Sequence, residues 1–472
     1  MSLNSANLTS GFIDLATFDQ IEDLLYGGPT ATAYFVRETR KSTWFTQAPV
    51  TLQKNAASTT FGSEWAANIT RAGDYLLNTW LRVTFPAVTL NSTNQFGANG
   101  RIRWTKNLMH ALIKDCQITF NDLVAARFDS VHLDFWTAFT VPAGKRNGYN
   151  NMIGNINDLI APHASTLPIG ATLPQTTLNL PLPFFYTRDS GVALPTAALP
   201  YNDMKIQFTF RDWDELLILD NSGASGAGTV ARAIPVAGTT TSGDLSTGVP
   251  ILVKTDVWAT YAIVSNEERM RMGVAPRDIL IEQVQISPKM VFNPIQNSQP
   301  SYDIRFSHAV KVLFWAVRNS TWKAEHSIYT TSSPYNAGGN TIQYTPPGSS
   351  DPIKVTSLLY ENTVRLSQMG SDYYSIVEPY YKAPVIPLET GYHMYSYSLN
   401  FNALDPLGST NYGKLTNVQI IPEASDAAIN SANGTGAPGS GYDYPQKYDF
   451  YLTCINNNIV RVSGGSLGFP IL

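Results

Sequence analysis

The chain has 472 residues, of which 43% are hydrophobic and only 14% are charged, and its formal net charge is −4. Intrinsic disorder needs the opposite balance of low hydrophobicity and high charge, and a chain of this length exceeds one ordinary core, so we expect two or three folded domains. No basic tail or stripe is present, which argues against direct binding of nucleic acid.

The N-terminal segment is predicted to carry one short amphipathic helix. Thr17 and Gln20 have the spacing of a capping box, and Gly27 stands where a glycine commonly ends a helix. The apolar residues between them recur at helical spacing: Phe18, Ile21, Leu24 and Leu25. This arm either packs against the domain that follows or docks to a separate partner. Met1 to Leu25 lacks a basic segment followed by an apolar one, so we expect no secretory signal, and we expect no membrane span because no apolar run reaches ~18 residues.

Most of the remaining chain alternates apolar and polar residues with the period of two that is typical of half-buried β-strands. In Lys205 to Arg211, the apolar residues Ile206, Phe208 and Phe210 alternate with polar ones. Three further apolar faces are expected: Tyr75, Leu77, Leu81, Val83 and Phe85; Phe306, Val310, Val312 and Phe314; and His393, Tyr395, Tyr397, Leu399 and Phe401. Clusters of Pro and Gly separate these runs, so the sequence predicts an all-β sandwich or barrel.

The two cysteines lie inside predicted strands. Cys116 follows Leu112-Ile-Lys-Asp, and Cys454 follows Phe450-Tyr-Leu-Thr. We expect two buried thiols, and a single disulfide between them is the alternative.

The same order of pieces occurs twice along the chain. A strand, a tract of small residues and a second strand follow one another at residues 205–210, 221–249 and 256–264, and again at residues 417–421, 425–441 and 448–455. The repeat of roughly 200 residues has the size of a domain. We therefore expect an N-terminal arm (1–30), a first β-domain (31–265), a charged linker (266–277) and a second β-domain (278–472) that opens with the strand Ile279 to Ile286.

Motifs for catalysis and cofactor binding are weak. Gly226 to Ala231 resembles a dinucleotide fingerprint, but Pro235 and a Gly/Thr-rich run replace the helix that must follow it. His132 and Asp134 present two potential ligands on one face of an expected strand, whereas a metal site usually needs three or four. Ser307 and His308 are neighbours in another expected strand and therefore point to opposite faces. We assign no catalytic, cofactor-binding or metal-binding residue and expect no cofactor.

Tyrosine-rich stretches leave two interpretations open. Asp372-Tyr-Tyr374 and Glu378-Pro-Tyr-Tyr381 could form an aromatic platform for sugars, or they could supply core and interface tyrosines. The second interpretation needs no ligand and is the one we favour.

Short stretches along the whole chain resemble the major capsid proteins of iridoviruses. The stretches are Thr9 to Thr17, Tyr26 to Gly28, Tyr34 to Val36, Arg71 to Asn78, Ile102 to Asn107, Phe120 to Asp122, Gly148 to Asn155, Leu180 to Phe185, Arg188 to Gly191, Leu199 to Asn202, Arg305 to Val310, Tyr360 to Thr363, Tyr373 to Pro379, Gly408 to Gly413 and Gly468 to Leu472. The small-residue tracts at residues 221–249 and 425–441 match least, as surface loops do.

This resemblance implies an all-β double jelly roll, in which two tandem eight-stranded jelly rolls follow the short helical arm. It also implies a homotrimer that forms pseudo-hexameric capsomers, which tile the icosahedral shell of a large DNA virus over an internal membrane. The implied partners are other copies of the chain, neighbouring capsomers, minor capsid proteins beneath the shell, and the internal membrane through the arm. The implied location is the virion, after assembly in the host cytoplasm, and the family brings no catalytic residues or cofactors.

The composition agrees with a shell subunit. Specific interfaces use aromatic and neutral polar groups with few charges at their centres, and many modest contacts add up across a lattice. Two other classes remain as alternatives: a carbohydrate-binding jelly-roll protein, favoured by the tyrosine content, and a jelly-roll enzyme, which would need a metal or a carboxylate pair.

Overall fold

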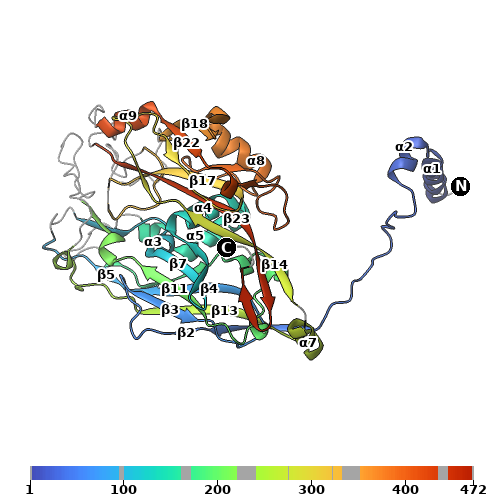
Figure 1. The fold of residues 1–472 in the computed structure, drawn as a ribbon, viewed down its shortest axis with the longest axis horizontal. Helices are drawn as coiled ribbons and strands as arrows, with labels where there is room; N and C mark the ends of the chain where they lie inside the picture. Colours follow the sequence, from blue (N-terminus) through green and yellow to red (C-terminus); the bar gives the residue numbers. More distant parts are fainter. Residues whose placement is uncertain are drawn as a thin grey trace. The chain divides into compact units, whose positions relative to one another are not determined.

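The computed structural model describes residues 3–94, 100–160, 172–220, 241–274, 276–321, 323–331, 351–433 and 445–469. The chain divides into two compact units, residues 1–44 and 45–472. Figure 1 shows the second unit as two layered β-sandwiches, one blue to green and the other yellow to red.

The first unit contains two helices, α1 (Leu3–Ala16) and α2 (Gln20–Leu25). The predicted helix therefore exists as α2, but the predicted cap is wrong. Asp19 caps α2 and forms a capping box with Glu22, because an aspartate carboxylate accepts from free N–H groups as well as threonine does. Thr17 instead donates its hydroxyl to the carbonyl of Asp14, at 2.6 Å, just after the end of α1. Helix α1 was not predicted from the sequence.

In the first sandwich, a four-stranded sheet packs face to face against a second sheet. One sheet has the order β1-β13-β4-β10, and the other contains β3-β11-β7-β8 with the short β2 at its edge. The strands are β1 (Phe45–Thr51), β2 (Gln53–Lys54), β3 (Glu64–Asn68), β4 (Tyr75–Phe85), β7 (Ile113–Phe120), β8 (Leu123–Phe128), β10 (Thr176–Pro181), β11 (Met204–Phe210) and β13 (Lys254–Val264).

The second sandwich has the same plan. Its sheets have the orders β14-β23-β17-β20 and β16-β22-β18-β19. The strands are β14 (Arg277–Ile286), β16 (Tyr302–Asp303), β17 (Ala309–Asn319), β18 (Ile353–Tyr360), β19 (Thr363–Gly370), β20 (His393–Ser396), β22 (Val418–Ala424) and β23 (Tyr448–Ser463).

The strand order is identical in the two sandwiches. When the eight main strands of each sandwich are numbered along the chain, one sheet has the order 1-8-3-6 and the facing sheet has the order 2-7-4-5. All pairings within these sheets are antiparallel, as in β1 with β13 and β14 with β23. Two successive Greek keys folded into facing sheets make a jelly roll. The predicted fold class, two tandem eight-stranded jelly rolls after a helical arm, is confirmed.

Alternation predicted the buried face correctly where a strand is regular. In β11 the residues from Met204 to Phe210 alternate between buried and half-buried, and Ile206, Phe208 and Phe210 face the core as predicted. In β4 a register shift opposite Thr260 and Tyr261 skips Leu77. Leu76 is therefore buried in place of the predicted Leu77, because an extra residue in a bulge reverses the side chains beyond it.

A bulge also overturns the face predicted for β17. The strand begins at Ala309, and its register shifts between Val310 and Val312. Val310 and Phe306 consequently lie in the core of the second sandwich, whereas Val312 and Phe314 lie in a separate cluster on the other side of the sheet. The face predicted to end in Phe401 is likewise too long, because β20 ends at Ser396 and Leu399 is exposed.

Short helices connect the strands. α3 (Leu108–Leu112), α4 (Ser130–Thr140), α5 (Ala143–Ile153) and α6 (Asn157–Ile160) belong to the first half of the chain. α7 (Asn266–Val274), α8 (Glu378–Lys382) and α9 (Asp426–Asn433) follow. In Figure 1, α3, α4 and α5 lie between the strands of the two sandwiches. The segment predicted as a charged linker is largely helical, because it forms α7.

The strand β23 takes part in both cores, and its neighbour β14 contributes to the core of the first sandwich. Ile279, Ile281, Val460 and Val462 belong to the core of the first sandwich, whereas Phe450, Leu452 and Cys454 belong to the core of the second. The 16-residue strand β23 therefore extends from one core into the other.

Both cysteines are buried free thiols, in β7 and β23. Burial raises the pKa of Cys116 and Cys454 well above the usual value. The expectation of two buried thiols is confirmed, and the alternative disulfide does not form. Among the described helices, none is long and apolar enough to cross a membrane.

Candidate functional site

The surface that joins the two sandwiches holds a group of buried polar side chains, and we call this surface the seam. Its apolar part is built from α4 of the first half and β17 of the second. Phe135 and Phe139 stack on Phe314, with ring centroids 5.9 and 5.3 Å apart. Val131, Ala138, Val312 and Ala316 complete this cluster on the outer face of the β17 sheet. A helix packed on a sheet face excludes water from both, so polar groups in the seam must find partners within the protein.

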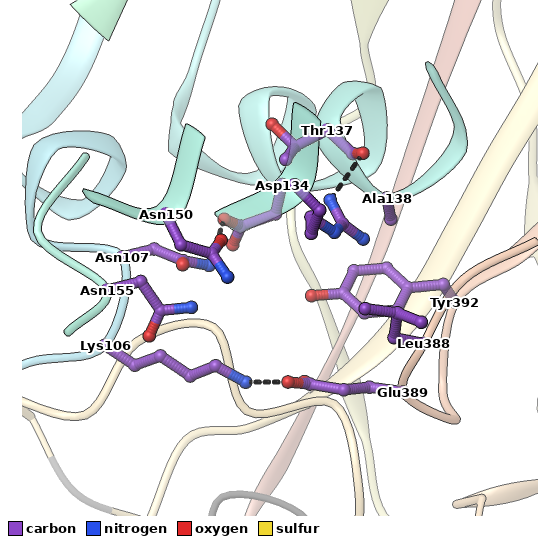
Figure 2. Close-up of a pocket in the computed structure, with 11 residues that line it drawn as sticks. Lys106, Asn107, Asp134, Thr137, Ala138, Asn150, Asn155, Leu388, Glu389 and Tyr392 are labelled. Carbon is purple, nitrogen blue, oxygen red and sulfur yellow. Dashed lines mark hydrogen bonds and ion pairs between the residues drawn. The ribbon is translucent and has the colours of Figure 1, made fainter. Parts of the chain in front are cut away.

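Asp134 is the hub of the polar part (Figure 2). From the first half of the chain, Asn107 donates to its carboxylate at 3.1 Å, and His110 Nδ1 lies 2.7 Å away. From the second half, the hydroxyls of Ser327 and Tyr329 donate at 2.7 and 2.8 Å. Burial by itself raises the pKa of Asp134, but the contact with His110 and the two hydroxyl donors outweigh it, so the pKa lies below its usual value. Asp134 thus remains a carboxylate that links both sandwiches.

Two further ion pairs cross the seam. Lys106 pairs with Glu389, and Arg103 pairs with Glu325. The side chains of Arg103 and Glu325 are 0% and 2% exposed, so solvent does not screen their attraction. A buried pair is strongly destabilising to break although it adds little when intact, and it therefore acts chiefly to fix the relative position of its two elements.

A third charged group ties the connection after β10 to the second sandwich. Glu282 of β14 accepts from Lys311, which stands at the bulge of β17, and lies 3.1 Å from Arg188 Nε. The Arg188 guanidinium also lies 4.4 Å from the ring centroid of Trp136 in α4, which is cation–π geometry. Lys311 is fully buried, and its ammonium also donates to the carbonyl of Ala403.

A small cavity of about 70 Å³ lies in the seam. Figure 2 shows Lys106, Asn107, Asn150 and Asn155 on one side and Leu388, Glu389 and Tyr392 on the other. This volume suits a few water molecules and leaves no room for a sizeable substrate. The polar residues around it hold the sandwiches together, and nothing in their arrangement pairs a nucleophile with a base.

The structure corrects the two histidine predictions. His132 and Asp134 lie on the helix α4 and not on a strand. His132 is buried, and burial lowers its pKa to about 3, so its ring is neutral. Ser307 and His308 precede β17 and are not part of it, and His308 occupies a left-handed turn with φ of 61°.

Other sequence candidates give no site among the described residues. No group of three or more His, Cys, Asp or Glu side chains there could hold a metal ion. The dinucleotide-like stretch Gly226 to Ala231 lies outside the described residues.

The tyrosines do not form a flat platform. Tyr374 is buried and donates to the carbonyl of Thr356 at 3.2 Å. Tyr380 and Tyr381 are exposed, but their rings meet edge to face at 86°. A sugar ring stacks on a flat aromatic face, so this geometry favours the interpretation as core and interface tyrosines.

Sequence reasoning singled out Asp134 only as a possible metal ligand on a strand, and it did not identify the other residues of the seam. One signal was available: Asp129 before Ser130 is a good N-cap, and Val131, Phe135, Ala138 and Phe139 follow at helical spacing. The ion pairs had no such signal, because Arg103 and Glu325 are 222 residues apart.

Families of known proteins match both halves of the chain. Residues 33–261 match the family described as "Major capsid protein N-terminus" and residues 268–468 match "Large eukaryotic DNA virus major capsid protein". The major capsid protein of Invertebrate iridescent virus 6 is 61% identical over 473 residues, with all of both chains covered. That of Lymphocystis disease virus 1 (isolate Darai) is 50% identical over 471 residues, and that of Rana tigrina ranavirus is 44% identical over 472, again with all of both chains covered.

Solved capsid structures share the fold at low sequence identity. A chain of the PBCV-1 virus capsid superimposes with a TM-score of 0.70 at 19% identity and covers 93% of this chain and 100% of its own. The Faustovirus major capsid protein gives a TM-score of 0.68 at 13% identity and covers 92% of this chain and 93% of its own. With matches along its whole length, the chain belongs to the major capsid proteins of large eukaryotic DNA viruses, in the iridovirus group, a family of structural proteins and not of enzymes.

Proposed function

We propose that the chain forms homotrimeric, pseudo-hexameric capsomers that tile the icosahedral shell of a large DNA virus. The observation that carries this proposal is the repeated strand order, 1-8-3-6 against 2-7-4-5. One copy supplies two lobes of the same build, so three copies around a threefold axis supply six similar lobes. A closed symmetric ring of this kind has an outline close to a hexagon and can tile a surface.

The seam supports this role. A tile transmits lateral forces only if its two lobes keep a fixed relative position, and the ion pairs Lys106–Glu389 and Arg103–Glu325 with the Asp134 hub fix that position. The domain boundaries that we propose are an arm (1–30), a first jelly roll (31–265), a linker (266–277) and a second jelly roll (278–472). The linker contains α7, whose Arg269 lies 2.8 Å from Asp74 in the first jelly roll.

The remaining partners and the location form part of the same proposal. Neighbouring capsomers contact the trimer at its rim, and minor capsid proteins lie beneath the shell. The N-terminal arm contacts either these minor capsid proteins or the internal membrane. Assembly takes place in the host cytoplasm, and the mature location is the virion capsid.

We place trimer contacts in the irregular connections at residues 188–201 and 406–414. In the second connection Leu407 is 38% exposed, and Tyr412 is buried with its hydroxyl 2.8 Å from that of Tyr397. The connection is therefore anchored from within while it presents an apolar side chain outward, as interface loops do.

Deleting residues 408–413 should abolish trimers, measured by sedimentation velocity of the purified protein. Because the deletion also removes Tyr412, the milder variant Leu407→Arg separates misfolding from lost contact: we expect a folded monomer with an unchanged circular dichroism spectrum. Val291→Arg, at another exposed apolar position, is the matched control and should remain trimeric. Unchanged trimers in the deletion variant, or an equal loss in the control, would remove this loop from the interface.

A further inference from the structure

The N-terminal arm carries the whole net charge of the chain. Residues 1–36 contain four acidic residues, Asp14, Asp19, Glu22 and Asp23, and no lysine or arginine before Arg37. The full chain has 36 acidic and 32 basic residues, so residues 37–472 have 36 − 4 = 32 acidic and 32 basic residues and are formally neutral. The acidic character is thus concentrated in α1 and α2.

The same two helices present large apolar side chains to solvent. In α1, Leu8, Phe12 and Leu15 recur at positions i, i+4 and i+7 and are at least 64% exposed. In α2, Leu24 and Leu25 are 86% and 70% exposed. Helices of this kind gain little stability alone and normally bury the apolar face against another surface.

We propose that α1 and α2 dock into an apolar groove rimmed by lysine and arginine on a second, different protein of the virion. This inference rests on the proposed role of the chain as the shell subunit. Apolar side chains supply the area that is buried, and the acidic residues supply charge complementarity, which speeds association and selects a basic partner.

The charge of the arm argues against a lipid surface. Helices that lie on membranes carry lysine and arginine on their polar face, and each basic residue near an anionic leaflet gains about 1 kcal/mol. The charged residues of the arm before Arg37 are all acidic, and its other polar residues are neutral, so an anionic leaflet repels it. A second copy is also a poor partner, because the remainder of the chain offers no net positive charge.

The connection to the sandwiches allows the required reach. Residues 26–44 form no helix or strand. Nineteen residues span at most about 60 Å when fully extended, at about 3.3 Å each. The arm can therefore engage a protein that does not touch the strands.

Carbodiimide cross-linking of intact virions tests the proposal, since this reagent joins carboxylates directly to lysines. We expect mass spectrometry to find links from Asp14, Glu22 or Asp23 to lysines of another virion protein. A reagent that joins only amines should give no links from side chains of residues 1–36, because this stretch contains no lysine. Unlinked arm carboxylates, or links only to other copies of this chain, would overturn the proposal.

A pair of variants separates docking from chance proximity. Leu24→Asp with Leu25→Asp keeps every carboxylate but removes the apolar contact, so the links should fall at least tenfold. Thr30→Asp with Thr32→Asp adds the same charge in the connection and should leave them unchanged. Equal yields from both pairs would overturn the role of the apolar face.

Vesicle flotation of the purified full-length protein tests the membrane alternative. We expect no binding to phosphatidylcholine vesicles with or without phosphatidylserine, and binding through the arm to either would replace the protein partner by a membrane. Sedimentation of the same samples reports trimers independently. A trimer with an unlinked arm therefore refutes this inference alone, whereas a monomer refutes the proposed function.

Discussion

The two jelly rolls have the same strand order, but their cores are closed in different ways. Every residue in the core cluster of the second roll, from Phe292 to Cys454, comes from that roll. The core of the first roll includes Ile279, Ile281, Val460 and Val462, which belong to β14 and β23. The core of the second roll is therefore built from its own residues, while the core of the first roll also needs two strands of the second, one of which, β23, lies at the far end of the chain. Two rolls with the same strand order can thus differ in whether each completes its core with its own residues.

Removing the residues after Asn458 tests whether the first roll depends on β23, and of all the changes considered it should have the largest effect on stability. The truncation takes Val460 and Val462 from the first core and exposes the edge of β14, with which they pair. We expect the first roll to lose most of its hydrogen-exchange protection while residues 290–454 stay protected. Loss of protection in both rolls alike would mean that the two cores form one cooperative unit.

An exposed ion pair in the same region gives the matched control. Arg461 and Asp278 bind each other at 2.7 Å, but their side chains are 54% and 50% exposed. Such a pair contributes little to stability. Arg461→Ala should leave the exchange pattern unchanged, so a loss of protection in this variant would mean that β23 acts through its surface and not through the core.

The variant Asp134→Ala tests how the two rolls are held together at the seam. Each roll supplies two of the side chains that contact the Asp134 carboxylate. The change leaves His110, Ser327 and Tyr329 without their shared acceptor in a dry environment. Unsatisfied buried groups cost about 1–3 kcal/mol each, so for these three groups we expect the free energy of unfolding to fall by at least about 3 kcal/mol. Asp134→Asn keeps part of the acceptor and should lose less. Equal losses in chemical denaturation would show that the charge, and not the hydrogen bonding, holds the rolls together.

The sequence predicted regular strands well and the seam poorly, for physical reasons. Alternation identified β11 because one face of the strand is buried and the other half-exposed. It placed Leu77 and Val312 on the wrong faces because a one-residue bulge leaves no mark in the pattern. α4 was mistaken for a strand because nine of its eleven residues are buried, so it lacks the polar face that shows helical periodicity. The ion pairs of the seam join residues that only the finished fold brings together.

The smallest expected effect concerns pH and also tests α4. The pKa of His132 is about 3 in the fold because of burial, and it is about 6.5 in an unfolded chain. The unfolded state therefore binds an extra proton between these values, so stability falls as the pH drops below about 6.5 and is unaffected above it. At pH 5 the loss from this residue is about 2 kcal/mol.

His132→Gln should remove that part of the acid sensitivity. Denaturation curves at pH 7.5 and pH 5, recorded at one protein concentration, should differ by about 2 kcal/mol less in the variant than in the parent. An unchanged difference would mean that His132 is protonated within the fold and that α4 is open to water.

The position of β23 also has a consequence for synthesis. The last strand of the first roll, β13, is complete when Val264 has been synthesised. Val462, which belongs to the same core, is not added until 198 residues later. At about 5–20 residues per second this interval lasts roughly 10–40 s. During that time the nascent first roll has an incomplete core and an exposed apolar edge, so it is a natural client for chaperones. An unfinished chain therefore lacks a complete first roll, and under the proposed function we expect only full-length chains to join a growing particle.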